Sequence, residues 1–388
     1  SGTGTLTLAG ANTYGAGGTV INSGGIVKVT NNDGLGTGGV TVNSGGELLL
    51  SGVTLSSGNT ISLNGTGVGS AGALATTGST ANTVNGTITL AGATTINATN
   101  SGDSLSLATI TGAGFGLTLG GAGTFTQTGA IGGTGTTLTA NGTGTVILSQ
   151  ANNYTGNTSI SNGTLSVTDA SALGSAGSIS ITSGGTLNIN GVALGNTNTI
   201  TLNSAGVGGN GGITGTGTAS FSNPITLSGA STIGAGSGTL TFSGNISNSS
   251  GASVYLIADN SGSWNVYAGT GTKGKVCGAG NTRCGGTPSG TVSTSGTVNI
   301  YYDPDTFGSA ETAYTGAPAA TSYMLINELG SASDAATVNS LGALSNNNSL
   351  WSLSFALGKD IDARITNPAN GSPVTGSAWS SAGFSPIG

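Results

Sequence analysis

The chain has 388 residues, of which 76 are glycine, 5% are charged and none is histidine. Six cationic side chains are too few to neutralise a run of phosphates, so no nucleic-acid partner is expected, and no apolar run reaches the roughly twenty residues that span a bilayer. Glycine lacks the three-residue period of collagen, and a hydrophobic content of 35% in alternating runs argues against a disordered chain.

Residues 1–141 consist of short runs in which aliphatic side chains take one face of a strand and Thr, Ser or Asn the other. The runs recur at intervals of 20 or 21 residues, and Gly-rich turns such as Ser44-Gly45-Gly46 separate them. This repeat predicts an all-β fold, a parallel β-helix (β-solenoid) with about twenty residues per coil, and the usual hand of parallel crossovers predicts that it is right-handed. The expected interior lining is Leu6, Leu8, Val20, Val27, Val29, Val40, Val42, Leu48, Leu50, Ile61, Leu63, Ile88, Leu90, Ile96, Leu105, Leu107, Leu117 and Leu119.

Residues 142–270 repeat the first segment. Tyr154 corresponds to Tyr14, and Asn152 corresponds to Asn12. The chain is therefore predicted to contain a first β-helix superrepeat over 1–141 and a second over 142–270. Because the Asn and Tyr pair recurs with the repeat, we expect it to pack at a coil corner; a glycan-binding aromatic is the alternative.

Residues 271–320 interrupt the repeat and are predicted to form an irregular insertion. They hold the chain's two cysteines, Cys277 and Cys284, whose spacing is compatible with a small disulfide-closed loop. A zinc site would need further Cys or His ligands, which the sequence lacks. Half of the cationic residues lie beside the cysteines and form a candidate contact loop for an acidic partner, a surface glycan or another subunit: Lys273, Lys275 and Arg283. The alternative is a solubilising insertion without a ligand.

Residues 321–388 are predicted to form a C-terminal solenoid extension, with a short helix possible at 333–344. The pair Asp360 and Asp362 could serve a hydrolase or a calcium ion, but no further acidic cluster accompanies it, so a solenoid turn is favoured.

The enzyme hypothesis, a carbohydrate-active β-helix acting as a polysaccharide lyase or hydrolase, needs an acid, a base or a metal cluster on one face of the stack. The chain has no histidine, and no charged residue lies between Asp169 and Asp259. We expect no catalytic residue, no metal and no cofactor.

Several phrases resemble a known family. GTGTVILSQANNYTG from Gly142 and TVINSGG from Thr19 resemble the passenger-associated repeats of autotransporters and large exported adhesins. Motifs near the C-terminus are similar to a passage of filamentous-haemagglutinin-type adhesins: VNIYYDP from Val298, SYMLIN from Ser322, FALGKDIDA from Phe355 and GFSPIG from Gly383.

The resemblance implies a non-enzymatic secreted or cell-surface protein of a Gram-negative bacterium, part of a larger adhesin or extracellular filament for attachment or matrix scaffolding. We expect the chain to be a piece of a longer protein, after its export signal and before any anchor, and we expect its two thiols to pair in an oxidising environment. The expected partners are host or bacterial surface glycans and, because open solenoid ends expose unpaired strand edges, other copies of the chain stacked end to end; truncation of a longer chain is the alternative explanation of an open end.

Overall fold

The structure is a computed structural model. It describes residues 3–247, apart from positions 16, 57, 176, 183, 196, 197 and 236–238. Beyond these it describes residues 340, 341 and 344 and the strands β29 (Val254–Ile257), β30 (Ser263–Tyr267), β31 (Lys275–Cys277), β32 (Val292–Ser293), β33 (Val298–Tyr302), β34 (Ala320–Ile326) and β35 (Phe355–Leu357).

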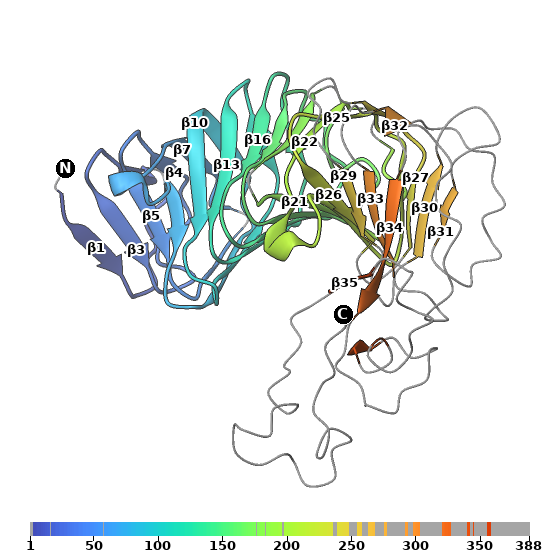
Figure 1. Ribbon diagram of the computed structural model, residues 1–388. Helices are drawn as coiled ribbons and strands as arrows, with labels where there is room; N and C mark the ends of the chain where they lie inside the picture. The colour runs from blue at the N-terminus through green and yellow to red at the C-terminus, as the bar shows by residue number, and fades with distance from the viewer. Residues whose placement is uncertain are drawn as a thin grey trace, which may run out of the picture.

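The strands form a parallel β-solenoid of about 11 turns, with successive turns roughly 21 residues apart (Figure 1). This confirms the predicted all-β solenoid. Following the hydrogen bonds from coil to coil gives three faces, which we call A, B and C. Each coil contributes at most one strand to each face, so every backbone ladder runs along the solenoid axis.

Face A is a stack of strands that pair in parallel from the first coil onward. Its strands are β1 (Thr5–Leu8), β3 (Ile26–Val29), β5 (Glu47–Leu50), β8 (Leu74–Thr76), the second half of β10 (Ile88–Ala98), β13 (Gly116–Gly121), β16 (Thr137–Ala140), β18 (Thr158–Ile160), β20 (Ile179–Thr182), β22 (Ile200–Asn203), β25 (Ile225–Leu227), β28 (Ile246–Ser247) and β32.

Face B is a second stack of the same kind. Its strands are β6 (Thr54–Leu55), β9 (Ala81–Val84), β11 (Ser104–Leu107), β14 (Thr124–Gln127), β17 (Thr145–Leu148), β19 (Thr164–Val167), β21 (Thr186–Asn190), β23 (Ile213–Thr216), β26 (Ser231–Gly234), β29, β33, β34 and β35.

Face C is interrupted in the middle of the solenoid, where segments 152–155, 170–173 and 192–195 continue the stack outside the named strands. Its strands are β2 (Thr19–Ile21), β4 (Val40–Val42), β7 (Ile61–Gly65), the first half of β10, β12 (Ile110–Gly112), β15 (Ile131–Gly132), β24 (Thr218–Phe221), β27 (Thr239–Phe242) and β30.

The interior is a column of aliphatic side chains. Leu48 and Leu187, which occupy corresponding places in the two superrepeats, are both 0% exposed. Of the predicted lining, the residues from Val27 to Leu119 are all buried, and Leu8 packs against this core while partly exposed.

Two residues of the predicted lining are more than half exposed. Val20 is 58% exposed because β2 pairs with β4 so that Val20 lies opposite Thr41, and its neighbour Ile21 points inward instead. Leu6 is 59% exposed although it pairs with the buried Val27, because no described strand pairs with β1 on its other side. The prediction that Val20 lines the interior was therefore wrong, whereas Leu6 lies in register with Val27 on the inward side of its strand.

The internal duplication is visible in two short 3-10 turns, η1 (Val68–Ser70) and η2 (Val207–Gly209). Each follows a glycine with φ near +80°, Gly67 at 79° and Gly206 at 78°, a conformation that a side chain disfavours. The second copy is nevertheless rotated by one face: β5 lies on face A, whereas its counterpart β21 lies on face B. The chain visits the faces in the order C, A, B within each coil. Between β5 and β21 it makes a whole number of coils plus one further face, so the second copy starts one face later than the first.

The later part of the chain departs from the regular stack. Ile246 pairs with Val292, 46 positions on, so more than one coil of chain intervenes. Within that interval β30 and β31 form the one antiparallel pair among the described strands. Leu341 and Leu344 have helical backbone, and the Leu344 amide donates to the Ser340 carbonyl at 3.2 Å; the rest of the helix predicted at 333–344 lies outside the described residues. The boundaries drawn from the sequence at 141, 270 and 320 stay predictions.

We expect Leu48→Ala to lower the free energy of unfolding by about 2–5 kcal/mol, because it leaves a cavity in a fully buried column. Leu6→Ala is the matched control and should cost far less, since Leu6 is already 59% exposed. Urea unfolding followed by circular dichroism measures both variants. Equal losses for the two would contradict the continuous interior column.

Candidate functional site

The contact loop predicted from the sequence lies mostly outside the described residues. Lys275 and Cys277 are the first and last residues of β31, whose backbone pairs with β30. Lys273, Arg283 and Cys284 lie outside the described part. The contact loop and the Cys277 to Cys284 disulfide therefore stay predictions.

The recurring Asn and Tyr residues lie at corresponding corners and make the same contacts. The hydroxyl of Tyr154 is 2.7 Å from Oγ1 of Thr158, and that of Tyr14 is 2.9 Å from Oγ1 of Thr19. Tyr154 is fully buried, and burial raises its pKa to about 12, an effect that the hydrogen bond to Thr158 partly offsets. At Tyr154 these contacts are those of a packing residue, because a buried ring offers no surface to a glycan; the ring of Tyr14 makes the same hydrogen bond to a threonine hydroxyl but is 39% exposed.

The asparagine beside each tyrosine ties neighbouring coils together. Nδ2 of Asn152 donates to the Ala172 carbonyl at 2.6 Å, and Nδ2 of Asn12 donates to the Gly34 carbonyl at 2.7 Å. Oδ1 of Asn152 also accepts from the backbone N–H of Ile131 at 2.7 Å and from the side-chain amide of Gln127. One amide side chain thus satisfies polar groups on the coils before and after it.

Glu47 is a buried carboxylate that the sequence analysis missed. It is 4% exposed, and its carboxylate accepts the backbone N–H of Val68 at the start of η1. Desolvation raises the pKa of Glu47, and the hydrogen bond from Val68 opposes that rise only in part. In the second copy Thr186 holds the corresponding turn, with Oγ1 accepting the Val207 N–H at 2.9 Å. Glu47 therefore positions a turn and is held away from solvent.

Asp103 is the second buried carboxylate, 1% exposed. Its Oδ2 accepts from Oγ1 of Thr76 at 2.8 Å and from Asn100 through the backbone N–H at 3.0 Å and Nδ2 at 3.1 Å, while Oδ1 accepts the Thr80 N–H at 3.0 Å. Burial by itself would raise the pKa of Asp103, but these donors outweigh it and lower the pKa. The carboxylate thus links turns of two successive coils, and both of its oxygens accept hydrogen bonds from groups of the protein.

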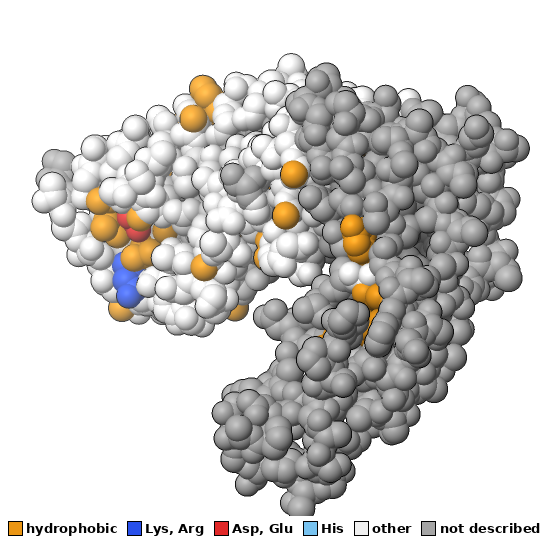
Figure 2. Space-filling model, in the orientation of Figure 1, with side chains coloured by type: hydrophobic (Ala, Val, Ile, Leu, Met, Phe, Trp, Pro, Cys, Tyr) orange, Lys and Arg blue, Asp and Glu red, His pale blue; other side chains and the backbone are white. Residues whose placement is uncertain are grey.

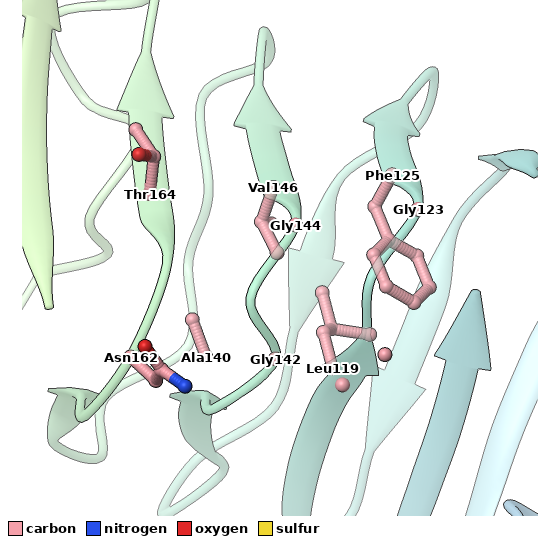
Figure 3. Close-up of a pocket in the computed structure, with 11 residues that line it drawn as sticks. Leu119, Gly123, Phe125, Ala140, Gly142, Gly144, Val146, Asn162 and Thr164 are labelled. Carbon is pink, nitrogen blue, oxygen red and sulfur yellow. The ribbon is translucent and has the colours of Figure 1, made fainter. Parts of the chain in front are cut away.

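Two interior clefts among the described residues, each of about 10 Å³, are too small for a ligand. One lies at the corner between faces A and B and measures about 10 Å³, close to the volume of a single water molecule (Figure 3). Leu119, Phe125 and Val146 line its apolar side, and Gly142 and Gly144 lie on the backbone beside it. A Cβ at Gly142 would collide with the carbonyl oxygen of Gly121, so the corner requires glycine for coil-to-coil contact.

A larger depression of about 290 Å³ is open to solvent on the outside of face C. It is lined by Gly15, Gly17, Gly18, Gly39, Val40, Thr41, Thr60, Ile61, Ser62 and Thr89. The lining contains neither an aromatic nor a charged side chain. Such a surface offers hydroxyls and backbone groups for hydrogen bonding, and it lacks the groups that acid–base catalysis requires.

The outside of face A carries a straight column of hydroxyl groups. Residues of successive strands lie directly opposite one another in register: Thr95, Thr118, Thr139, Ser159, Ser180, Thr201, Thr226 and Ser247. Neighbouring members are separated by the strand spacing of about 4.7–4.9 Å. On the face of the molecule that Figure 2 shows, most side chains of the described residues are neither hydrophobic nor charged.

Charges are few throughout the described part of the chain. Over 3–247 they are Lys28, Asp33, Glu47, Asp103 and Asp169. The described residues include no cluster of three or more Cys, Asp or Glu side chains that could hold a metal ion. Nor does any helix within them have the length and apolar character needed to cross a membrane.

Comparison with known families gives one match. The model of the passenger-associated-transport-repeat matches residues 1–29 and 138–167, the segments that open the two superrepeats. Searches of curated proteins and of solved structures returned no match. The chain therefore carries autotransporter passenger repeats, which imply an extracellular or surface location.

We expect Glu47→Gln to stabilise the protein at pH 7. The pKa of Glu47 is raised in the folded state. The contribution of Glu47 to the free energy of unfolding is therefore fully present below the unfolded pKa of about 4.3 and is lost as the pH rises through the folded pKa. The variant's melting temperature should exceed that of the wild type at pH 7, by about 2–4 °C for each kcal/mol of relieved penalty, and the difference should shrink toward pH 4. Asp33→Asn, which removes an exposed charge, is the control; a gain independent of pH would contradict the assignment.

We expect Asp103→Asn to destabilise the protein by about 1–3 kcal/mol at pH 7, since an amide NH2 would face a donor where the carboxylate now accepts. The lowered pKa gives the opposite pH trend: the stabilisation from Asp103 is present above the unfolded pKa of about 3.9 and is lost as the pH falls through the folded pKa. Thermal unfolding from pH 7 to pH 3 tests this. Asp169 accepts a single N–H, that of Ser171, which the Oδ1 of an asparagine can still accept, so Asp169→Asn should cost less.

Proposed function

We propose that the chain is a non-enzymatic rod, the passenger part of an exported adhesin or extracellular filament of the filamentous-haemagglutinin type, on the surface of a Gram-negative bacterium. The observation that carries this proposal is the parallel stack of about 11 turns, whose described interior is aliphatic and whose described outer surface consists mainly of hydroxyl and amide side chains. The passenger repeats that open both superrepeats support it.

The stack is suited to a mechanical role. Each coil contacts only its neighbours, so stability grows with every coil added, and the length grows at about 4.7–4.9 Å per coil. Buried side chains such as Asn152, Asp103 and Thr186 bridge successive coils by hydrogen bonds. Such a rod can hold a contact surface away from the cell without a large globular core.

The composition of the outside favours neutral partners such as surface glycans. A row of uncharged hydroxyls offers donors and acceptors without the desolvation cost of charges. A single such hydrogen bond contributes only about 0.5–1.5 kcal/mol, so useful attachment would require many of them along the rod.

Three of the four carboxylates in the described part of the chain favour a structural role over a catalytic one; the fourth, Asp33, is exposed. Glu47 and Asp103 are buried and accept backbone or side-chain donors from turns, and Asp169 accepts the N–H of Ser171. A glycosidase needs two carboxyl groups on either side of a scissile bond, roughly 5–10 Å apart in an accessible groove. Acids engaged in this way support the non-enzymatic proposal.

The proposal is tested by incubating the purified chain with surfaces that bear neutral, sulfated or uronic polysaccharides. We expect the chain to be retained on neutral glycans while the length of the glycan, followed by size-exclusion chromatography, stays unchanged. Shortening of any polysaccharide would replace the proposal with the carbohydrate-active alternative. Failure to bind any surface would remove the adhesive role.

Two variants show whether retention uses the hydroxyl column of face A. Thr139→Lys with Thr201→Lys places long charged side chains within the column and should weaken retention. Thr111→Lys, on the exposed side of face C, is the matched control and should retain glycan like the wild type. Equal losses in both would point to nonspecific adsorption.

A further inference from the structure

The corner between faces A and B at residues 161–163 holds an asparagine whose side chain lies against the next backbone amide. The N–H of Gly163 donates to Oδ1 of Asn162 at 2.9 Å. Figure 3 shows Asn162 on the turn that leads into the strand of Thr164. The hydrogen bond brings the Gly163 nitrogen close to Cγ of Asn162, the carbon that carries both Oδ1 and Nδ2. Asn162 is exposed, so water reaches this side chain.

The shortness of the corner explains the contact. The corresponding corner of the first copy, residues 22–25, has four residues between its strands, and the N–H of Gly25 donates to the backbone carbonyl of Asn22 at 3.0 Å. The corner at 161–163 has three residues, and here the side chain of Asn162 supplies the acceptor for the glycine N–H. The sequence of the corner therefore places a nitrogen and an amide carbon side by side.

The glycine of this pair is required by the stack. Gly163 has φ of +62°, and a Cβ there would collide with the carbonyl oxygens of Gly142 and Gly144 on the preceding coil. The following coil holds the same residue from the other side, since the Thr186 N–H donates to the Gly163 carbonyl at 2.9 Å. The nitrogen is thus kept in place on a residue without a side chain to hinder its approach to Cγ, an orientation that favours reaction.

We propose that Asn162-Gly163 is a self-modification site, at which the folded protein converts asparagine to aspartate and isoaspartate. A base from the solvent removes the N–H proton of Gly163, the nitrogen bonds to Cγ, and Nδ2 takes up a proton and leaves as ammonia. The product is a cyclic succinimide. Water then adds to one of its carbonyl carbons and breaks the bond from that carbon to the nitrogen. Overall, water is consumed and ammonia is released, and no group is oxidised or reduced.

The two products differ in their effect on the corner. When water opens the ring at Cγ, the product is aspartate, whose carboxylate still accepts the Gly163 N–H in a charge-assisted hydrogen bond. When water opens it at the backbone carbon, the product is isoaspartate, which adds a methylene to the main chain. That extra length displaces Gly163 from the Thr186 N–H and from the adjoining bond of the Thr164 N–H to the Gly144 carbonyl, at 3.0 Å. Aspartate preserves the corner and isoaspartate disrupts it.

Other Asn-Gly pairs of the chain serve as internal references. At two of them the glycine N–H is bonded away from its own asparagine: Gly191 donates to the Thr216 carbonyl at 2.8 Å, and Gly211 donates to the Ala205 carbonyl at 2.8 Å. Attack by these nitrogens first requires the local structure to open. The inference rests on this difference in geometry and is independent of the surface role proposed above.

The test incubates the folded chain in heavy-oxygen water at mildly alkaline pH and follows each Asn-Gly pair by mass spectrometry after digestion with pepsin. We expect Asn162 to take up the label at least about tenfold faster than Asn190 and Asn210, whose glycine amides must first be released. In urea the three rates should converge. Equal rates in the folded chain would overturn the proposal, and so would an equally large lead of Asn162 in urea, which would place the cause in the local sequence.

Two variants separate the reaction from its consequence. Asn162→Gln moves the amide carbon one methylene away from the Gly163 nitrogen and should abolish label uptake at this position; continued uptake would contradict attack by that nitrogen. Asn162→Asp carries the aspartate product from the start and should melt at the temperature of fresh wild type. Aged wild type, with its isoaspartate measured by enzymatic methylation, should melt lower. An unchanged melting temperature with isoaspartate present would contradict the effect assigned to the corner.

Discussion

The structure depends on one constraint, the parallel hydrogen-bond register between successive coils. A strand residue on one coil pairs with the residue about 21 positions later, and the pairing decides which side chains enter the interior. Because side chains alternate across a strand, a shift of one position would send the aliphatic column outward. The rigid register therefore explains both the dry interior and the polar outside.

The same register limits which polar residues can be buried. A carboxylate or amide inside the stack must find its donors on the coil it belongs to or on an adjacent one. Asp103 accepts hydrogen bonds from three residues on neighbouring turns, whereas Glu47 accepts a single backbone N–H. Their pKa values consequently move in opposite directions, so the two carboxylates give opposite contributions to the pH dependence of stability.

Much of the fold could be predicted from the sequence, because the period and the alternation are physical consequences of stacking. Which residues of a short strand point inward could not be predicted in the same way. Strand β2 reads Thr19-Val20-Ile21, and either of its two adjacent aliphatic residues could point inward until the pairing with β4 is known. The one-face rotation of the second superrepeat was equally hidden. It depends on positions such as 152–155 and 192–195, which continue a face without the alternation of a strand.

The site residues were harder to predict for a related reason. A charged residue in a strand is ordinarily assigned to the surface, so Glu47 gave no signal by itself. The duplication held the missing information: Glu47 aligns with Thr186, which is buried and accepts the N–H of the equivalent turn. In a duplicated solenoid, the burial of a residue is thus better judged from its counterpart in the other copy than from its own chemistry. Tyr14 and Tyr154 make the same hydrogen bond to a threonine hydroxyl but differ in exposure, so that difference reflects what packs against each coil.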